Sequence, residues 1–287
     1  MRAVTATVLV IRRGGLGDTL LMLPVLAALR RAHPGAALHF AGVHEFAAVL
    51  QHFAAVDRAL SSETLQLWAL SQDTPAGAAA RARLCSHAHV VADDAAVLAV
   101  ADATRVQVFD PRPARDDLPL AVQIGAQLGL AVSLDDARLC APVSAQPRGP
   151  VVLAPGAGSP QKCWARDRWL ELARSLAADG AQVLVVVGPT ELERDDPQRW
   201  PWPTGTGFVV ETSCVRLAER LRAARAFVGN DSGPTHLAAA LSVPTVALFG
   251  AGRPRVFAPP GPHVRVVGEP TGGPPSASVA VVRSALV

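Results

Sequence analysis

Tyrosine is absent from this sequence of 287 residues, and lysine occurs once, as Lys162, while the other 26 basic residues are arginines. The four cysteines (Cys85, Cys140, Cys163 and Cys214) show no C-x-x-C spacing. This argues against a disulfide framework or a zinc site and favours reduced thiols in the cytoplasm. No apolar run approaches the roughly 18 uncharged residues that span a bilayer. We therefore expect a soluble, cytoplasmic protein with at most peripheral membrane contact.

Hydrophobic residues make up 50% of the chain and charged residues 18%, a composition that buries a large core and excludes wholesale disorder. The length predicts two domains of roughly 100–150 residues each. The net charge of +3 is too small to indicate a nucleic-acid partner. The excess of arginine is typical of a GC-rich genome, in which an idle lysine drifts to arginine, so the surviving Lys162 is a candidate functional residue.

The first half of the chain has the pattern of a β–α–β unit. Residues 5–12 (TATVLVIR) predict a buried parallel strand that ends in the glycine turn RGGLGD. A helix (TLLMLPVLAALRRAHPG) and a second strand (ALHFAGV) follow. Further on, the pattern predicts a helix over 45–60 and short strands over 89–93 and 105–109 with a brief helix between them. This order is typical of a doubly wound α/β fold.

Arg12 and Arg13, followed by an apolar stretch, also resemble an export signal. Asp18 interrupts that stretch, no A-x-A cleavage pattern follows, and a strand precedes the arginines. We interpret the segment as the first β–α unit of the fold.

The Pro-rich passage APVSAQPRGP (141–150) is the best domain boundary, because the pattern restarts after it. The restart predicts a strand and glycine loop over 150–159, a strand and turn over each of 181–190 and 226–233, and a strand over 244–251. It predicts helices over 167–180, 216–225 and 234–243. We expect an N-terminal domain over 1–147 and a C-terminal domain over 148–287, both Rossmann-like, with a cleft between them. The weakly helical final residues are expected to pack back on the N-terminal domain.

The segment GNDSGPTHLAAALSVPTVALFG (229–250) predicts a strand that leads through Asp231 into the start of a helix. Ser232 is suited to cap this helix, Gly233 lets the backbone approach a ligand, and Pro234 suits the first turn. The free N–H groups there form an anion site suited to a phosphate, which His236 would also contact. An equally good interpretation is a capped core helix in which the ring nitrogens of His236 form hydrogen bonds within the protein.

The segment APGAGSPQKCWARDRW (154–169) places Lys162 in a glycine loop between a strand and a helix, another arrangement that faces phosphate. It is not a Walker A loop, because the G-K-[ST] ending is missing. The alternative for Lys162 is an ordinary solvated lysine. We interpret Trp164 and Trp169 as packing residues.

The segment RRGGLGD (12–18) contains Gly15 and Gly17, half of a dinucleotide-binding fingerprint whose other half is missing. Asp18 is either the N-cap of the next helix or a carboxylate that points into the interdomain cleft. We interpret the four Asp-Asp pairs as loop and cap residues rather than metal ligands: Asp93/Asp94, Asp116/Asp117, Asp135/Asp136 and Asp195/Asp196.

Together the three segments resemble glycosyltransferase family 9, the ADP-heptose:lipopolysaccharide heptosyltransferases. NDSGPTHLAAALSVPTVALFG is similar to the D-[ST]-G-x-x-H-x-A-A signature of that family, PGAGSPQKCW to its P-G-A-x-x-x-x-K-x-W loop, and VIRRGGLGDTLLMLPVLAALR to its N-terminal R-x-x-x-x-G-D segment. The resemblance covers most of the chain and is strongest over 150–260.

The resemblance implies a GT-B fold, in which two Rossmann-like domains face each other across a cleft, the first binding the acceptor and the second an ADP-heptose or similar nucleotide-sugar. It implies that Asp18 is the general base and that no metal or cofactor is required. It assigns acceptor contacts to Arg12, Arg13 and Gly17. It assigns donor contacts to Gly158, Ser159, Lys162, Glu191, Asp231, Ser232, Gly233 and His236, where the match of Glu191 needs a small gap.

Departures from the family lie on the acceptor side. The stretch VVADDAAVLAVADATRVQVF lacks the Gln-Gly of the D-x-Q-G strand end, and LSSETLQLWALSQDTPAGAAARA lacks a lysine-rich element. We therefore expect an inverting heptosyltransferase whose acceptor is either the lipopolysaccharide inner core or a soluble small molecule such as a natural-product precursor. The alternatives are a nucleotide-sugar epimerase of the same fold and a non-catalytic nucleotide-sugar-binding protein.

Overall fold

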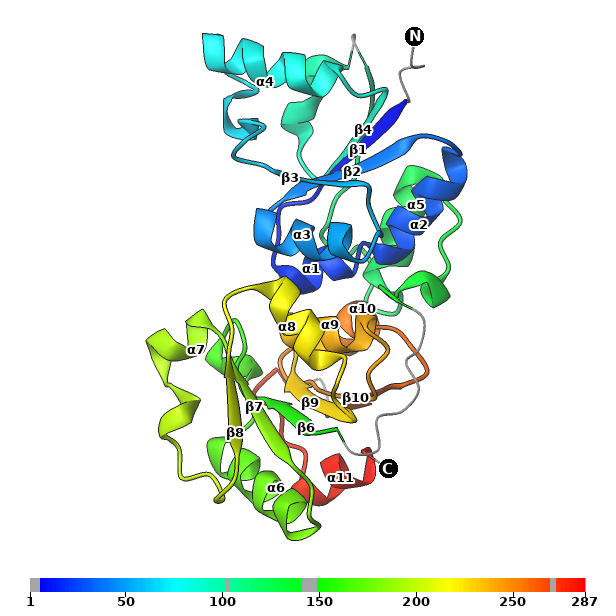
Figure 1. Ribbon diagram of the computed structural model, residues 1–287. Coiled ribbons are helices and arrows are strands. Elements are labelled where there is room, and N and C mark those ends of the chain that lie inside the picture. Colours follow the sequence, from blue (N-terminus) through cyan, green and yellow to red (C-terminus); the bar gives the residue numbers. More distant parts are fainter. Residues whose placement is uncertain (1–5, 102–103, 141–148, 269–271, 287) are drawn as a thin grey trace. The chain divides into compact units, whose positions relative to one another are not determined.

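A computed structural model describes residues 6–101, 104–140, 149–268 and 272–286 (Figure 1). The chain divides into two compact units, Met1–Leu139 and Cys140–Val287. The boundary expected between residues 147 and 148 lies outside the described residues. Each unit contains one parallel sheet with flanking helices, so the expected pair of Rossmann-like α/β domains is confirmed.

The N-terminal unit is built on a parallel sheet of five strands in the order β3-β2-β1-β4-β5. The apolar run predicted as a strand forms β1, the central strand, in which Leu9, Val10 and Ile11 are fully buried. Ile11 pairs with Ala41 on one side and with Ala92 on the other. The strands are β1 (Thr7–Ile11), β2 (Ala37–Gly42), β3 (Arg58–Ser61), β4 (His89–Ala92) and β5 (Arg105–Val108).

The helix expected after the glycine turn is interrupted. It forms α1 and then α2, because Pro24 has no N–H to donate and its ring would clash with the carbonyl of Leu20, the last residue of α1. α5 packs against α2 (Figure 1). The helices of this unit are α1 (Leu16–Leu20), α2 (Leu23–Ala32), α3 (His44–His52), α4 (Pro75–Cys85) and α5 (Leu120–Leu128), with short 3-10 helices η1 (Leu67–Ala69), η2 (Ala95–Val100) and η3 (Leu134–Asp136).

The helix predicted over 45–60 is wrong in its second half. α3 ends at His52, a turn with Ala54 at a positive φ of 57° follows, and β3 begins at Arg58. The backbone N–H of Ala59 in that strand donates to Gln51 Oε1 at 2.7 Å, which fastens the strand to the end of the helix. Among the other elements, α4 and α5 were not anticipated from the sequence.

The C-terminal unit is built on a parallel sheet of six strands in the order β11-β10-β9-β6-β7-β8. The four strands predicted from the sequence are confirmed with shorter bounds, and two edge strands, β8 and β11, were not anticipated. The strands are β6 (Val151–Ala154), β7 (Val183–Val187), β8 (Gly207–Val210), β9 (Ala226–Asn230), β10 (Thr245–Leu248) and β11 (Val264–Val267).

The three helices predicted in this unit are confirmed as α6, α8 and α9. The last helix, α11, packs against α6, and Val279 and Val282 lie in the core of the C-terminal unit, where the sequence had suggested a return to the N-terminal domain. The helices are α6 (Arg166–Ala178), α7 (Pro189–Arg194), α8 (Cys214–Leu221), α9 (Gly233–Ala240), α10 (Pro254–Phe257) and α11 (Val279–Ser284), with 3-10 helices η4 (Pro160–Lys162) and η5 (Pro197–Arg199). Within the described ranges no helix has the length and apolarity of a membrane span.

Candidate active site

Three of the predicted donor residues meet where β6 and β9 end. The two strands are parallel neighbours, with Ala154 opposite Gly229, so the loop after β6 and the turn after β9 leave the same edge of the sheet side by side. Lys162 Nζ lies 2.7 Å from Asp231 Oδ2, and His236 Nε2 lies 3.8 Å from Asp231 Oδ1. The lysine side chain is 38% exposed, whereas the aspartate side chain is only 8% exposed.

The Asp231 carboxylate is held in its charged form. Burial by itself would raise the pKa of Asp231, but its interactions with His236 and Lys162 outweigh the burial and hold the pKa below its ordinary value. His236 is itself buried and faces this carboxylate. The side chain of Lys162 is therefore fixed at one end of a charged cluster and open to solvent.

Asn230, which precedes this cluster, was missed as a site residue. Its side chain is fully buried, its Nδ2 donates to the carbonyl of Pro155 at 2.7 Å, and its Oδ1 accepts from the backbone N–H of Trp164 at 3.0 Å. The Asn230 amide thus fastens both ends of the loop that carries Lys162 (residues 155–164, the lysine loop) to the end of β9. A polar residue that ends an apolar strand is the signal that would have found it.

The start of α9 follows directly. Ser232 occupies the N-cap position and Gly233 is the first helical residue, as expected, but the hydroxyl of Ser232 accepts no hydrogen bond from the first turn. Its Oγ lies 3.5 Å from Thr235 Oγ1, which donates to the carbonyl of Asn230 at 2.6 Å. The side-chain cap expected from Ser232 is therefore wrong, because its hydroxyl lies toward Thr235 instead of the backbone.

Glu191 lies on the other side of the glycine loop, at the third position of α7. Its Oε2 accepts from the backbone N–H of Gly188 at 2.8 Å. The carboxylate lies so close to Gly156 that a Cβ there would be 1.8 Å from Oε1. The carbonyl of Gly158 accepts from Arg194 Nη1 at 3.1 Å, and Ser159 is the residue before η4.

A pocket of about 260 Å³ opens beside Glu191. Its wall includes the Arg166 guanidinium, which lies 5.2 Å from the ring centre of Trp200. The lining residues between 155 and 166 belong to the segment that the sequence singled out, and Glu191 was predicted as well. The other lining residues, in and beside α7 and η5, share no motif and were missed. The lining residues are Pro155, Gly156, Ala157, Pro160, Cys163, Trp164, Arg166, Thr190, Glu191, Arg194, Asp195, Pro197 and Trp200.

Trp164 and Trp169 pack as expected. Both indoles are buried, and they meet edge to face with ring centres 5.1 Å apart. Trp164 Nε1 donates to the carbonyl of Ala277 at 3.0 Å. Their packing fixes the start of α6 behind the lysine loop.

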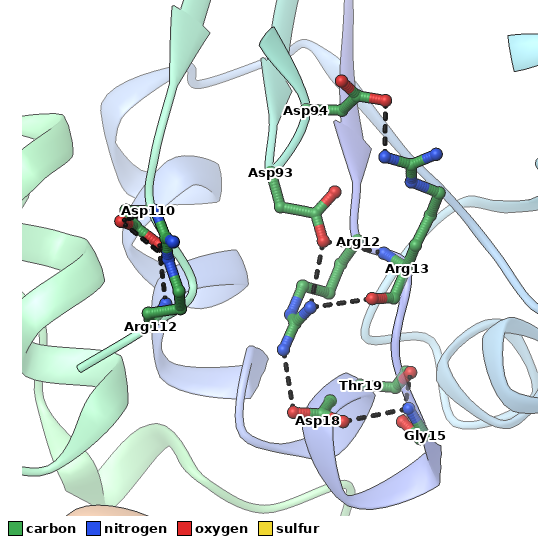
Figure 2. Close-up of polar contacts among 9 residues, drawn as sticks. All are labelled: Arg12, Arg13, Gly15, Asp18, Thr19, Asp93, Asp94, Asp110 and Arg112. Atoms are coloured by element: carbon green, nitrogen blue, oxygen red, sulfur yellow. Dashed lines mark hydrogen bonds and ion pairs between the residues drawn. The ribbon is translucent and has the colours of Figure 1, made fainter. Parts of the chain in front are cut away.

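The predicted residues of the N-terminal unit gather at the carboxyl ends of β1 and β4. Arg12 Nη2 lies 2.7 Å from Asp18 Oδ1, and Arg12 Nη1 lies 2.9 Å from Asp93 Oδ2 (Figure 2). The side chains of Arg12 and Asp93 are 8% and 4% exposed, whereas that of Asp18 is 39% exposed. Arg13 is exposed and pairs with Asp94.

Asp18 is the third residue of α1, and Gly15 occupies the N-cap position, so the interpretation of Asp18 as N-cap is wrong. Its Oδ2 accepts from the backbone N–H of Gly15 at 2.9 Å. Gly17 lies within the same short helix. Gly14 has to be a glycine, because a Cβ there would be 2.7 Å from the Cβ of Asp18.

Asp93 lies in the loop between β4 and η2, as expected, but no sequence pattern indicated that its side chain is buried against Arg12. Its neighbour Asp94 is a cap: Oδ1 accepts from the N–H of Ala96 at 2.9 Å, at the start of η2. Asp196 likewise caps η5. Among the described residues no three His, Cys, Asp or Glu side chains form a group that could hold a metal ion.

The model of glycosyltransferase family 9 (heptosyltransferase) matches residues 119–279, which are more than half of the chain and include Lys162, Asp231 and His236. The chain belongs to glycosyltransferase family 9. The family resemblance carried by the lysine loop and the Asp231 turn is thereby confirmed.

Relatives within the family agree. Lipopolysaccharide heptosyltransferase 3 of Escherichia coli is 32% identical over 108 residues, which cover 35% of this chain and 31% of that protein, so the matched sequence spans about a third of the relative. The structure of Escherichia coli ADP-heptose lipopolysaccharide heptosyltransferase II has a TM-score of 0.71 at 20% identity over 98% of both chains. Escherichia coli heptosyltransferase WaaC with ADP has a TM-score of 0.71 at 19% identity, over 97% of this chain and 98% of that chain. These likenesses confirm the GT-B class for this family 9 member.

Proposed function

We propose that this chain is an inverting glycosyltransferase that moves a heptose, or a closely related sugar, from an ADP-activated donor to an acceptor hydroxyl. Membership of family 9 supports the reaction class, and the names of its relatives support ADP-heptose as the donor. The observation that carries the proposal is the contact of 2.7 Å between Lys162 and Asp231 at the start of α9. It sets a partly exposed ammonium beside a helix N-terminus, a combination that binds phosphate.

In this proposal the adenosine half of the donor enters the pocket beside Glu191, whose carboxylate accepts hydrogen bonds from the ribose hydroxyls. The diphosphate lies between Lys162, the loop at Gly158 and Ser159, and the backbone N–H groups that begin α9. As the bond from the diphosphate to the sugar breaks, its electron pair stays on the phosphate oxygen. The ammonium and the N–H groups stabilise that charge, so the proposal needs no metal ion.

Asp18 is the proposed general base. It takes the proton of the acceptor hydroxyl while the oxygen bonds to the anomeric carbon, and the opposite bond to the diphosphate breaks in the same step. Arg13 and Gly17, which lie beside Asp18 in the sequence, are proposed to contact the acceptor.

The proposed acceptor is the inner core of lipopolysaccharide, since the relatives carry that name. A soluble small molecule is the second candidate, because the sequence between β3 and β4 contains no lysine to meet a phosphorylated lipid core. Transfer assays that offer heptose-free lipopolysaccharide core and water-soluble hydroxyl compounds separate the two.

The test of the donor site is ADP binding by calorimetry. Lys162→Ala is expected to weaken binding by about 10–100-fold, because a charged hydrogen bond contributes about 1.5–3 kcal/mol. Arg168→Ala, which removes an exposed cation of α6, is the control. If Lys162→Ala binds ADP as tightly as the parent chain, the diphosphate role is refuted.

The test of the reaction is sugar transfer from ADP-heptose. Asp18→Ala is expected to lower kcat by about 10²–10⁴-fold and to leave ADP affinity unchanged. Turnover of the donor without any acceptor would indicate an epimerase instead. Tight ADP-heptose binding with no turnover on any acceptor would indicate a binding protein.

A further inference from the structure

The buried carboxylate of Asp93 has no part in the chemistry above. β1 and β4 are parallel neighbours with Ile11 opposite Ala92, so Arg12 and Asp93 leave the sheet side by side. The N–H of Asp93 donates to the carbonyl of Ile11 at 3.2 Å. Its Oδ2 accepts both from Arg12 Nη1 and from the backbone N–H of Arg13, each at 2.9 Å (Figure 2). The carboxylate is thus oriented from two directions.

Arg12 connects this carboxylate to Asp18. Its Nη1 also donates to the carbonyl of Arg13 at 2.8 Å, and its Nη2 donates to Asp18. Its Nε is buried and has no hydrogen-bond partner in the part of the chain that the structure describes. The guanidinium is therefore held by its two Nη atoms, and Asp93 anchors the one that does not touch Asp18.

The cluster contains one cation and two carboxylates. A buried guanidinium needs a compensating anion, because leaving a buried charge unpaired is strongly destabilising. Asp93 is almost completely buried and supplies this compensation, whereas Asp18 is partly exposed. Asp18 therefore meets an arginine whose charge is already balanced.

We propose that Asp93 is a positioning residue for the general base. It holds Arg12 in place and neutralises its charge, so that Arg12 orients Asp18 without suppressing the tendency of Asp18 to take up a proton. This inference rests on the proposed function, in which Asp18 is the base.

Other charged groups at this edge of the sheet do not replace Asp93. Arg13 pairs with Asp94 at 2.5 Å, away from the Arg12 guanidinium (Figure 2). His44 and Glu45 lie in the first turn of α3, which packs against α1. These groups are unchanged when only Asp93 is substituted.

The first test is Asp93→Asn, which keeps the shape of the side chain and removes its charge. Arg12 then has Asp18 as its one counter-charge in the cluster, which makes Asp18 a weaker base. We expect kcat to fall about 10-fold, the KM for ADP-heptose to stay within about two-fold, and the acid limb of the kcat profile to move down by about one pH unit. Asp110→Asn, which breaks an exposed pair with Arg112 at the end of β5, is the control and should keep the parent profile.

The second test needs no turnover. Carboxyl ¹³C NMR, with the Asp18 signal identified from Asp18→Asn, is expected to show the titration midpoint of Asp18 about one pH unit lower in Asp93→Asn than in the parent chain. An unchanged midpoint, or a loss of kcat with an unmoved acid limb, overturns the proposal. A shifted midpoint in a chain that transfers no heptose would leave the positioning contact standing and sink the proposed function instead.

A third variant guards against misfolding. Asp93→Glu keeps the negative charge, so it is expected to retain the acid limb of the parent chain and a higher kcat than Asp93→Asn. If the acid limb shifts in Asp93→Glu as far as it does in Asp93→Asn, the proposal that the charge of Asp93 matters is overturned. If Asp93→Asn does not fold, a shift of the acid limb in Asp93→Glu overturns it as well.

Discussion

Replacing Gly156 with alanine should displace Glu191 from the pocket. The new Cβ would lie 1.8 Å from Oε1, 2.2 Å from Cδ and 2.5 Å from Cγ of Glu191. Non-bonded atoms settle at roughly 3.5–4 Å, so the carboxylate has to withdraw by roughly 1.5–2 Å. Withdrawal breaks its hydrogen bond of 2.8 Å with the N–H of Gly188. Because Glu191 is a flexible side chain, we expect the fold itself to lose only about 1 kcal/mol.

The effect on the donor should be larger. If Glu191 accepts hydrogen bonds from the ribose, losing its position removes a charged hydrogen bond, which contributes about 1.5–3 kcal/mol. Gly156→Ala is therefore expected to weaken ADP binding by about 10–100-fold. Calorimetry measures the affinity, and thermal unfolding of the same samples shows whether the variant is folded.

The double variant Gly156→Ala/Glu191→Ala shows whether the alanine acts by displacing the Glu191 carboxylate or by blocking the pocket directly. If the glycine change acts by displacing the carboxylate, it should have almost no further effect once the carboxylate is gone, so the two changes should be strongly non-additive. Additive losses would mean that the methyl group blocks the pocket directly and would refute the reasoning. ADP affinity that is unchanged in Gly156→Ala would refute it as well.

Three further changes test other parts of the structure. Gly14→Ala places a Cβ 2.7 Å from the Cβ of Asp18, whereas the Cβ of Gly15→Ala lies at an ordinary 3.7 Å from Asp18 Oδ2. We expect Gly14→Ala to lower kcat at least about 10-fold at unchanged ADP affinity. Equal kcat values in the two variants would contradict this. Trp164→Phe leaves a backbone carbonyl without its donor, whereas Trp169 Nε1 has no hydrogen-bond partner among the described residues. In urea unfolding, Trp164→Phe should therefore cost about 1–2 kcal/mol more than Trp169→Phe, and a larger loss in Trp169→Phe would count against this account. Burial lowers the pKa of His89 to about 4, so between pH 6.5 and 4 the unfolded chain binds a proton that the folded chain does not. The free energy of unfolding therefore decreases as the pH falls through that window, by up to about 3 kcal/mol from this residue. His89→Phe should flatten the pH dependence of unfolding there, and an identical dependence in both chains would show that His89 does not contribute.

The central strands could be predicted from the sequence, whereas of the four edge strands only β5 was predicted. β1, β6, β7 and β9 are continuous apolar runs because both faces of a parallel sheet are covered. β3, β8 and β11 are edge strands of only four residues with exposed positions. Runs this short (RALS, GFVV and VRVV) do not distinguish a strand from other structure. The break between α1 and α2 was readable in principle, since Pro24 marks it.

The residues of the candidate site likewise divide into those that could be predicted from the sequence and those that could not. Lys162 and Asp231 each lie in a motif that follows a strand, and the resemblance of these motifs to those of the family was sufficient to propose that both face the donor. Arg12 and Asp93 are 81 residues apart, and their contact depends on the register between β1 and β4. No local pattern around Asp93 carries that information, which is why its contact with Arg12 was not predicted.

The two clusters have opposite electrostatic arrangements. In the N-terminal unit a buried cation, Arg12, is balanced by the buried Asp93 and also holds Asp18, so the group that remains open to solvent is an anion. In the C-terminal unit the buried partner is an anion, Asp231, and the group open to solvent is the ammonium of Lys162. An aspartate accepts a proton only as the carboxylate anion, and a diphosphate site needs positive charge, so each unit presents the charge that its proposed role requires. The opposite assignment, with the N-terminal cluster binding the diphosphate, would set an exposed carboxylate against an anionic leaving group, and like charges at contact distance are destabilising.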